Sequence, residues 1–367
     1  MTAFYQSIRQ SWRTLVTACS LLLAGLLLQP AWATQLPNLY IAEVSADQQR
    51  QAWQREALIQ VIQRIAGQPE VLQHPALQQE LQQANTYIKQ FEAIRNEQGS
   101  ALRVVVDQQK LEQFFRQHQL PVWGNRRPQV LLWLVEQRPD GRQFISHADH
   151  EVVKQIQALA SQRGIPLIWP LYDMDDLLSL SETDVWAGFW QQIRQASARY
   201  QPDLTAALVL SASTNTETVM QQLFWQLDQQ QRVLRFEHSQ QQQEQLLHDF
   251  VWQLADHLAA NYSVNYLDQS VPVQLRVGGV QQWSDWVILQ RLLESFPGVT
   301  QVDLLHRTAE YADTQLILSI SQTDFLQLLG LEPQLRWSGS TDSTQSFSLI
   351  ERQADVAERF YVQFEPR

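Results

Sequence analysis

The residues best suited to chemistry form a short acidic run that follows an apolar segment. Asp173, Asp175 and Asp176 lie within four positions of one another, directly after residues 166–169 and Pro170. Acidic residues at the carboxyl end of a strand lie where α/β proteins hold ligands, and three carboxylates can coordinate a hard cation. The run lacks the glycine and the downstream glutamate of a calcium-binding loop. We favour carboxylates that cap the following turn, and a metal site remains the alternative.

A second string, Trp-Gly-x-Arg-Arg-Pro at positions 123–128, is the most distinctive in the chain. We expect Trp123 to be anchored in a seam between two domains, with Arg126 and Arg127 pairing carboxylates across it, because guanidinium groups bind carboxylates in a fork. Direct contact with a ligand or partner is the alternative. These three residues and the three aspartates are the candidate ligand or partner residues. No residue is assigned a catalytic or metal-binding role.

Other patterns that could carry chemistry are better explained by structure. His147, Asp149 and His150 lie where a predicted helix begins, and we expect them to cap it or to be solvated. No Gly-x-Ser-x-Gly nucleophile elbow occurs, and Gly278-Gly279 lacks the spacing of either phosphate-binding loop. The sequence therefore predicts no cofactor, and it favours a binding role over catalysis.

The first 33 residues have the features of an export signal. Arg9 and Arg13 precede an apolar run at 15–28, which is too short to span a bilayer, and residues 31–33 suit a signal peptidase. We expect cleavage after Ala33 and a periplasmic protein with no transmembrane segment in the mature chain. The single cysteine, Cys19, lies inside the signal, and its surroundings fit a lipoprotein signal poorly.

The overall charge argues against one class of partner. The chain has 27 basic and 38 acidic residues and a formal net charge of −11, which becomes −13 when Arg9 and Arg13 leave with the signal. A surface with this excess of negative charge repels nucleic acid and anionic lipid. Glutamine makes up roughly a sixth of the residues. Its clusters lie among apolar residues at helical spacing, which predicts solvated helix faces.

Hydrophobic periodicity divides the mature chain into three predicted domains: an N-terminal α/β domain at 34–125, a middle α/β domain at 126–264 and a C-terminal domain at 265–367. The first begins with a strand at 39–44 and a helix at 47–66, which Asp47 would cap and Gly67 would end.

The other two domains differ in the order of their elements. Strands and helices alternate in the middle domain, with helices at 148–162, 182–198 and 240–261, and such alternation indicates a layered α/β sheet. The C-terminal domain has the order βαββαβ of ferredoxin-like modules, followed by tail strands at 346–351 and 359–364. The predicted fold class is therefore α/β (α+β), with several small layered modules in tandem.

Several strings resemble the proteobacterial family called domain of unknown function 2066. They lie at residues 55–67, 123–134, 163–176 and 184–200, and the Trp-Gly-x-x-Arg-Pro pattern at 123–128 is among them. The resemblance extends over essentially all of the mature chain. It implies an exported protein, and it implies no established activity, substrate or catalytic residue.

We therefore expect an exported, non-catalytic binding or assembly module of the bacterial envelope, whose partner is another envelope protein. The alternative is a metal-assisted periplasmic hydrolase that uses Asp173, Asp175 and Asp176. An enzyme should have a deep pocket where carboxylates and a histidine converge. A binding module should have shallow apolar grooves between its domains.

Overall fold

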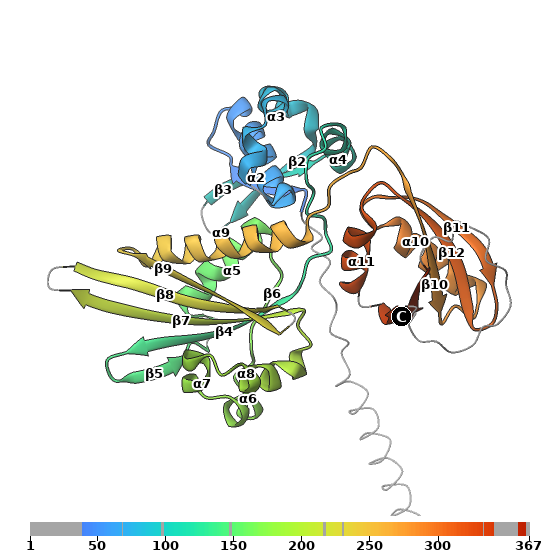
Figure 1. Cartoon of the computed structure of the whole chain (residues 1–367). Coiled ribbons are helices and arrows are strands. Elements are labelled where there is room, and N and C mark those ends of the chain that lie inside the picture. The colour runs from blue at the N-terminus through green and yellow to red at the C-terminus, as the bar shows by residue number, and fades with distance from the viewer. Residues whose placement is uncertain are drawn as a thin grey trace, which may run out of the picture. The chain divides into compact units, whose positions relative to one another are not determined.

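A computed structural model describes residues 39–67, 69–96, 99–146, 149–215, 218–229, 231–332, 334–340 and 359–364. In this part of the chain, three β-sheets lie one in each of the three predicted domains, with helices packed on them (Figure 1). The fold is therefore mixed α/β, with small layered sheets and no closed barrel among the described residues. None of the described helices is long and apolar enough to cross a membrane. The predicted signal lies outside the described residues.

The N-terminal sheet is antiparallel, with its three strands in the order β1-β3-β2. Its strands are β1 (Ile41–Ser45), β2 (Ile88–Asn96) and β3 (Gly99–Val106). The helices of this region are α2 (Arg50–Ala66), α3 (Pro75–Glu80) and α4 (Gln108–Gln117), with 3₁₀ turns η1 (Pro69–Gln73) and η2 (Leu81–Tyr87). The sequence did not predict β2, in which residues 89–93 and Arg95 are exposed.

Helix α2 forms because apolar residues recur every three or four positions along it. The predicted stripe is buried: Ala57, Leu58, Val61, Ile62 and Ile65. The helix ends at Gly67, as predicted, because Gly67 has φ 68°, a left-handed conformation that glycine adopts without strain. The predicted start was wrong, because the N-cap is Gln49 rather than Asp47 and its side chain makes no capping hydrogen bond.

The middle sheet has six strands and is covered by helices on both faces. The strand order is β5-β4-β7-β8-β9, with β6 paired to β4, and β4 runs parallel to β6 and β7. The strands are β4 (Val130–Arg138), β5 (Gly141–Phe144), β6 (Leu167–Ile168), β7 (Leu204–Asn215), β8 (Thr218–Gln229) and β9 (Arg232–Gln240).

Successive side chains of β4 point to opposite faces of the sheet, and each face contributes to a separate core. Val130, Leu132 and Leu134 face a core formed with α5 (Glu151–Arg163) and α9 (Gln243–Tyr262). Leu131, Trp133 and Val135 face the opposite core, which is covered by α6 (Met174–Ser179), α7 (Glu182–Ala187) and α8 (Trp190–Ser197). Figure 1 shows α6–α8 on one side of the strands and α5 and α9 on the other.

The sequence predicted one continuous helix at 182–198, and this prediction was wrong. Two helices, α7 and α8, replace it, because Gly188 has φ 70° and ends α7 in a left-handed turn. A side chain at this position would also collide with Gln226, which lies 2.7 Å from the place of a Cβ atom. The sequence also failed to predict α6 and β5, which are short.

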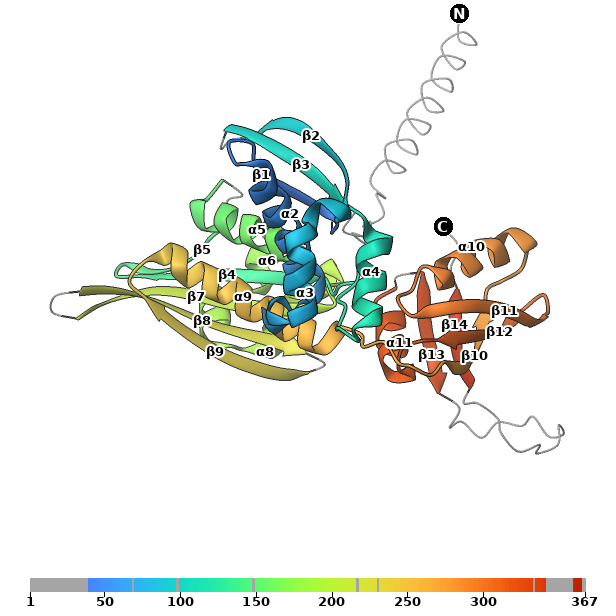
Figure 2. The same cartoon turned by 90° about the horizontal axis from the view of Figure 1, so that it is seen from above.

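The C-terminal region has the predicted βαββαβ order, and a seventh element completes its sheet. The elements are β10 (Val271–Gly278), α10 (Trp283–Glu294), β11 (Val299–Arg307), β12 (Tyr311–Leu318), α11 (Gln322–Gly330), β13 (Leu335–Ser340) and β14 (Arg359–Phe364). The predicted tail strand β14 lies between β10 and β13, so the strand order is β11-β12-β10-β14-β13 (Figure 2). The other predicted tail strand, at 346–351, lies outside the described residues.

Candidate functional site

The acidic run begins helix α6, and two of its three aspartates stabilise that start. Asp173 is the N-cap, and its Oδ1 accepts a hydrogen bond of 3.1 Å from the backbone N–H of Asp176. Asp176 is only 1 % exposed, and its carboxylate accepts hydrogen bonds from the backbone N–H of Tyr172 and from the hydroxyl of Tyr200. These two carboxylates therefore have structural partners.

Arg199 provides the positive charge that the acidic run requires. Its guanidinium lies 2.7 Å from Asp173, 3.2 Å from Asp176 and 3.9 Å from Asp175. The hydrogen bond from Arg199 is the main cause that lowers the pKa of Asp173. Burial, with the hydrogen bond to Asp176, raises the pKa of Tyr200 to about 12, so the phenol keeps its proton and donates it. An arginine thus occupies the position that a bound cation would otherwise take.

Histidines do not complete a metal site around these aspartates. Within the described ranges, no three His, Cys, Asp or Glu side chains are grouped so that they could hold a metal ion. His150 is the N-cap of α5, and its Nδ1 accepts a hydrogen bond from the backbone N–H of Val152, as the capping prediction requires. His147 lies outside the described residues.

We expect the stability of the protein to be independent of divalent cations. Adding millimolar calcium, magnesium or zinc, or a chelator, should leave the melting temperature unchanged. Asp175 is exposed and only distantly paired, so Asp175→Asn should change the free energy of unfolding by less than about 0.5 kcal/mol. The matched variant Asp176→Asn should cost about 1–3 kcal/mol, because its buried hydrogen bonds are lost. A metal-dependent rise in melting temperature that Asp175→Asn abolishes would contradict this interpretation.

Trp123 is fully buried at the junction of the N-terminal and middle sheets. Its indole belongs to the core beneath α9 and the middle sheet, and its backbone N–H donates to the carbonyl of Ile65 in α2 over 2.6 Å. The guanidinium of Arg127 lies 3.8 Å from the centre of the ring, which is cation–π geometry. Trp123 therefore joins residues of two predicted domains, and its ring has no surface open to a ligand.

Arg127 makes its contacts with backbone carbonyls and not, as predicted, with a carboxylate. All five of its N–H donors are used, over 2.7–2.9 Å. The acceptors are the carbonyl oxygens of Trp123, Gly124, Arg64, Arg163 and Gly164.

The position of these acceptors explains why a buried cation is tolerated there. Arg64 lies in the last turn of α2, and Arg163 and Gly164 form the C-terminal end of α5. The carbonyls at a helix C-terminus lack intrahelical donors and carry partial negative charge. Burial, together with the charges of Arg64 and Arg163, lowers the pKa of Arg127. The partial negative charge at the ends of two helices offsets part of that penalty. One side chain therefore joins α2 of the N-terminal region to α5 of the middle region.

Arg126 does pair a carboxylate, as predicted. Its Nε lies 3.2 Å from Glu332, and both side chains are almost fully buried. The same guanidinium donates to the carbonyl and the hydroxyl of Ser295 and stacks on Phe296. Glu332, Ser295 and Phe296 all belong to the C-terminal region. Consecutive arginines thus make contacts with different regions, and both serve the fold.

The sequence did not identify the exposed apolar residues around the acidic run. Six large apolar side chains are about half exposed or more within residues 171–189, and Leu178 reaches 79 %. We call this set the α6–α7 surface; its members are Leu171, Met174, Leu177, Leu178, Trp186 and Phe189. The sequence does contain a run rich in apolar residues at 171–180. Without the structure, this run could not be distinguished from a buried segment.

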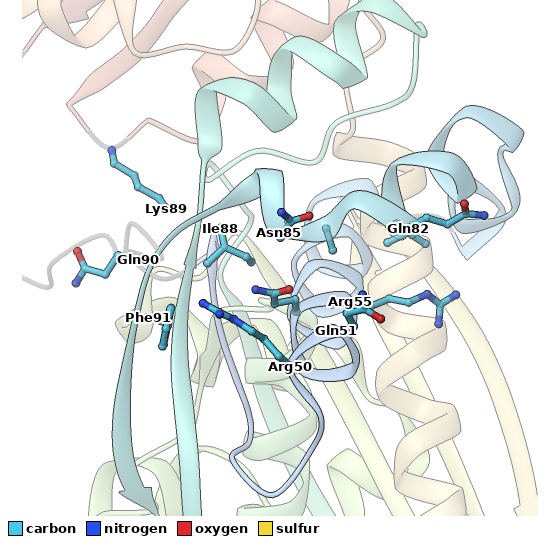
Figure 3. A pocket seen from close by; sticks show the side chains of 12 residues that line it. Arg50, Gln51, Arg55, Gln82, Asn85, Ile88, Lys89, Gln90 and Phe91 are labelled. Atoms are coloured by element: carbon cyan, nitrogen blue, oxygen red, sulfur yellow. The ribbon is translucent and has the colours of Figure 1, made fainter.

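The sequence also gave no indication of a cavity in the N-terminal region. The cavity measures about 960 Å³ and is lined by residues of α2, η2 and β2 (Figure 3). No carboxylate and no histidine lines it. This cavity therefore lacks the general acid, general base and metal ligands that the hydrolase alternative requires.

Comparisons with known proteins relate parts of the chain to uncharacterised or distant structures. A family model, "Domain of unknown function (DUF8605)", matches residues 33–124. No curated protein is significantly similar in sequence. The C-terminal domain of LpoB from Salmonella enterica is similar over 31 % of this chain and 83 % of that one, at 18 % identity and a TM-score of 0.21. A crystal structure of an uncharacterized protein is similar over 37 % of this chain and 92 % of that one, at 13 % identity and a TM-score of 0.19.

Proposed function

We propose that the protein is an exported, non-catalytic binding module of the bacterial envelope, and that the α6–α7 surface is where it holds a partner protein. The single observation that carries the proposal is the exposure of six large apolar side chains on neighbouring short segments. Exposed apolar patches mark interaction sites in soluble proteins, and these six residues lie within the 19 positions 171–189. The export signal predicted at residues 1–33, and the resemblance to domain of unknown function 2066, support the location.

The charge around this surface indicates the chemistry of the partner. Residues 171–189 contain five acidic residues and no lysine or arginine: Asp173, Asp175, Asp176, Glu182 and Asp184. Asp173 and Asp176 pair with Arg199, and Arg142 stacks on Trp186, but Asp175 is largely exposed. A partner with an apolar face and a basic rim would therefore be complementary, and charge of this sign discriminates between partners.

The rival function, a metal-assisted hydrolase, is less well supported. Its aspartates are engaged by a helix N-terminus, two tyrosines and Arg199. A general base or a metal ligand must be free to act on a substrate. The cavity described above lies elsewhere, in the N-terminal region, and has a cationic and amide lining.

A charged substitution within the α6–α7 surface tests the proposal. Leu178→Asp places a carboxylate at the most exposed residue of the apolar set, and we expect it to abolish capture of the partner from crosslinked envelope fractions. Because Leu178 is 79 % exposed, the melting temperature should stay within about 2 °C of the native value. Leu305→Asp is the matched control, since Leu305 is about half exposed in β11. A partner retained equally by both variants would refute the assignment of this surface.

A further inference from the structure

The cavity in the N-terminal region is built from one face of α2 and the segment opposite it. Arg50, Gln51, Gln54 and Arg55 follow each other at helical spacing on that face. The opposite side comes from η2 and the first residues of β2. The cavity's volume of about 960 Å³ is at the upper end of the range for ligand sites in proteins. It belongs entirely to residues 50–91.

The polar side chains that line this cavity are unpaired among the residues that the structure describes. Within the described ranges, none of its eight polar side chains makes a side-chain hydrogen bond or ion pair. They are Arg50, Gln51, Gln54, Arg55, Gln82, Asn85, Lys89 and Gln90. Gln54 is the most buried of them, at 9 % exposed, and its amide remains accessible within the cavity.

Some glutamines elsewhere in the described part of the chain do have side-chain partners. Gln60 pairs with Glu56 further along α2, and Gln155 pairs with Glu151 in α5, each across four residues. Gln290 and Glu294 form the same kind of pair in α10. The glutamines of the cavity have no such partner among the described residues, so their amides are available to a ligand.

The charge of the cavity is opposite to that of the chain. Arg50, Arg55 and Lys89 line it without any acidic residue, in a protein whose net charge is −11. Arg50 is the first residue of α2, where the helix dipole makes a cation unfavourable. That end also lacks a side-chain cap, and its first turn contains no acidic residue. An anion bound there would compensate all three deficits.

The arrangement of the side chains indicates an elongated ligand. In Figure 3, Arg50 extends toward Ile88 and Phe91, whereas Arg55 points in the opposite direction, on the side of Gln82. Lys89 points away from both arginines in this view. The exposed ring of Phe91 packs on Trp53 at 5.2 Å between centroids, so it is held in place and presents an apolar face.

We propose that this cavity binds an acidic oligosaccharide, a chain of sugar units with more than one carboxylate or phosphate group. Arginines directed to different parts of the cavity match repeated charges along such a chain, and charge-assisted hydrogen bonds are the strong ones. Side-chain amides donate and accept, which suits sugar hydroxyls. The face of Phe91 suits the apolar face of a sugar ring. The proposal rests on residues separate from the α6–α7 surface, so either can fail without the other.

Binding of trigalacturonate to the full-length protein, measured by calorimetry, tests this proposal. We expect trigalacturonate to bind, maltotriose of the same length but without charge to bind at least about tenfold more weakly, and affinity to fall as salt is added. Arg50→Gln should weaken binding at least about tenfold, since a charge-assisted hydrogen bond is lost. Arg95→Gln, an exposed arginine of β2 outside the lining, is the matched control and should bind normally.

Further measurements distinguish recognition of the sugar rings from recognition of the acidic groups. A phosphorylated trisaccharide that binds like trigalacturonate would support the site and show that either acidic group is accepted. Phe91→Ala should weaken the binding of trigalacturonate, because the ring on which a sugar stacks is removed. It should leave the melting temperature unchanged. The saccharide assignment would be overturned if triglutamate, or inorganic phosphate alone, bound as tightly as trigalacturonate. No binding of any acidic saccharide, or equal binding by Arg50→Gln and the native protein, would overturn the site itself.

Discussion

Replacing Arg127 by alanine will lower the free energy of unfolding by about 3–5 kcal/mol, among the largest effects of any single substitution in the described part of the chain. All five donors of this side chain meet carbonyl oxygens, and three of those oxygens belong to the C-terminal ends of α2 and α5. Removing the guanidinium leaves buried acceptors without a donor, and each costs about 1–3 kcal/mol. Chemical denaturation followed by tryptophan fluorescence measures the loss.

Two further substitutions give this prediction its controls. Arg127→Lys should recover only part of the loss, because a lysine has three donors at one point and cannot reach carbonyls from two helices at once. Arg103→Ala should cost less than about 1 kcal/mol, because its bonds to Glu43 and Glu92 are exposed. A loss below about 1 kcal/mol for Arg127→Ala would show that the two helices are held together by other contacts.

Trp123→Ala should cost about 3–5 kcal/mol, as large-to-small aromatic substitutions in a core do. The ring is fully buried, and the guanidinium of Arg127 stacks on it. Its removal therefore leaves a cavity and removes the cation–π contact of Arg127. Circular dichroism during thermal unfolding provides the measurement. Trp283→Ala is the matched control, because that ring is 63 % exposed and should contribute far less. If both variants unfold at the native temperature, Trp123 has no structural role, and its string would have to serve a ligand.

Local patterns in the sequence predicted most elements, and they failed where tertiary contacts decide. The apolar period of α2 and its end at Gly67 follow from local rules, since helical spacing and the left-handed glycine leave a direct trace in the sequence. The break at Gly188 does not, because the neighbouring residues continue a helical pattern on both sides. Strand β2 was missed because residues 89–93 and Arg95 are exposed, so the strand lacks the alternation of buried and exposed residues that identifies a half-buried strand.

The roles of site residues were less predictable than the elements. The sequence correctly gave Arg126 a carboxylate partner, although it could not identify Glu332, which lies 206 positions away. It could not predict the partners of Arg127, because backbone carbonyls exist at every residue and only the fold selects five of them. Arg199 was missed for the same reason, since 23 residues separate it from Asp176. The cavity between α2 and β2 required both elements to be placed in space.

A photoreactive residue placed at position 178 in the living cell tests the central claim, partner binding through the α6–α7 surface, most directly. The same residue at position 305 serves as the control, because Leu305 is also exposed but lies outside this surface. Our account predicts a discrete crosslinked species of one protein partner from position 178 and none from position 305, with both proteins exported and folded. The absence of any species from position 178, or the same species from both positions, would contradict it.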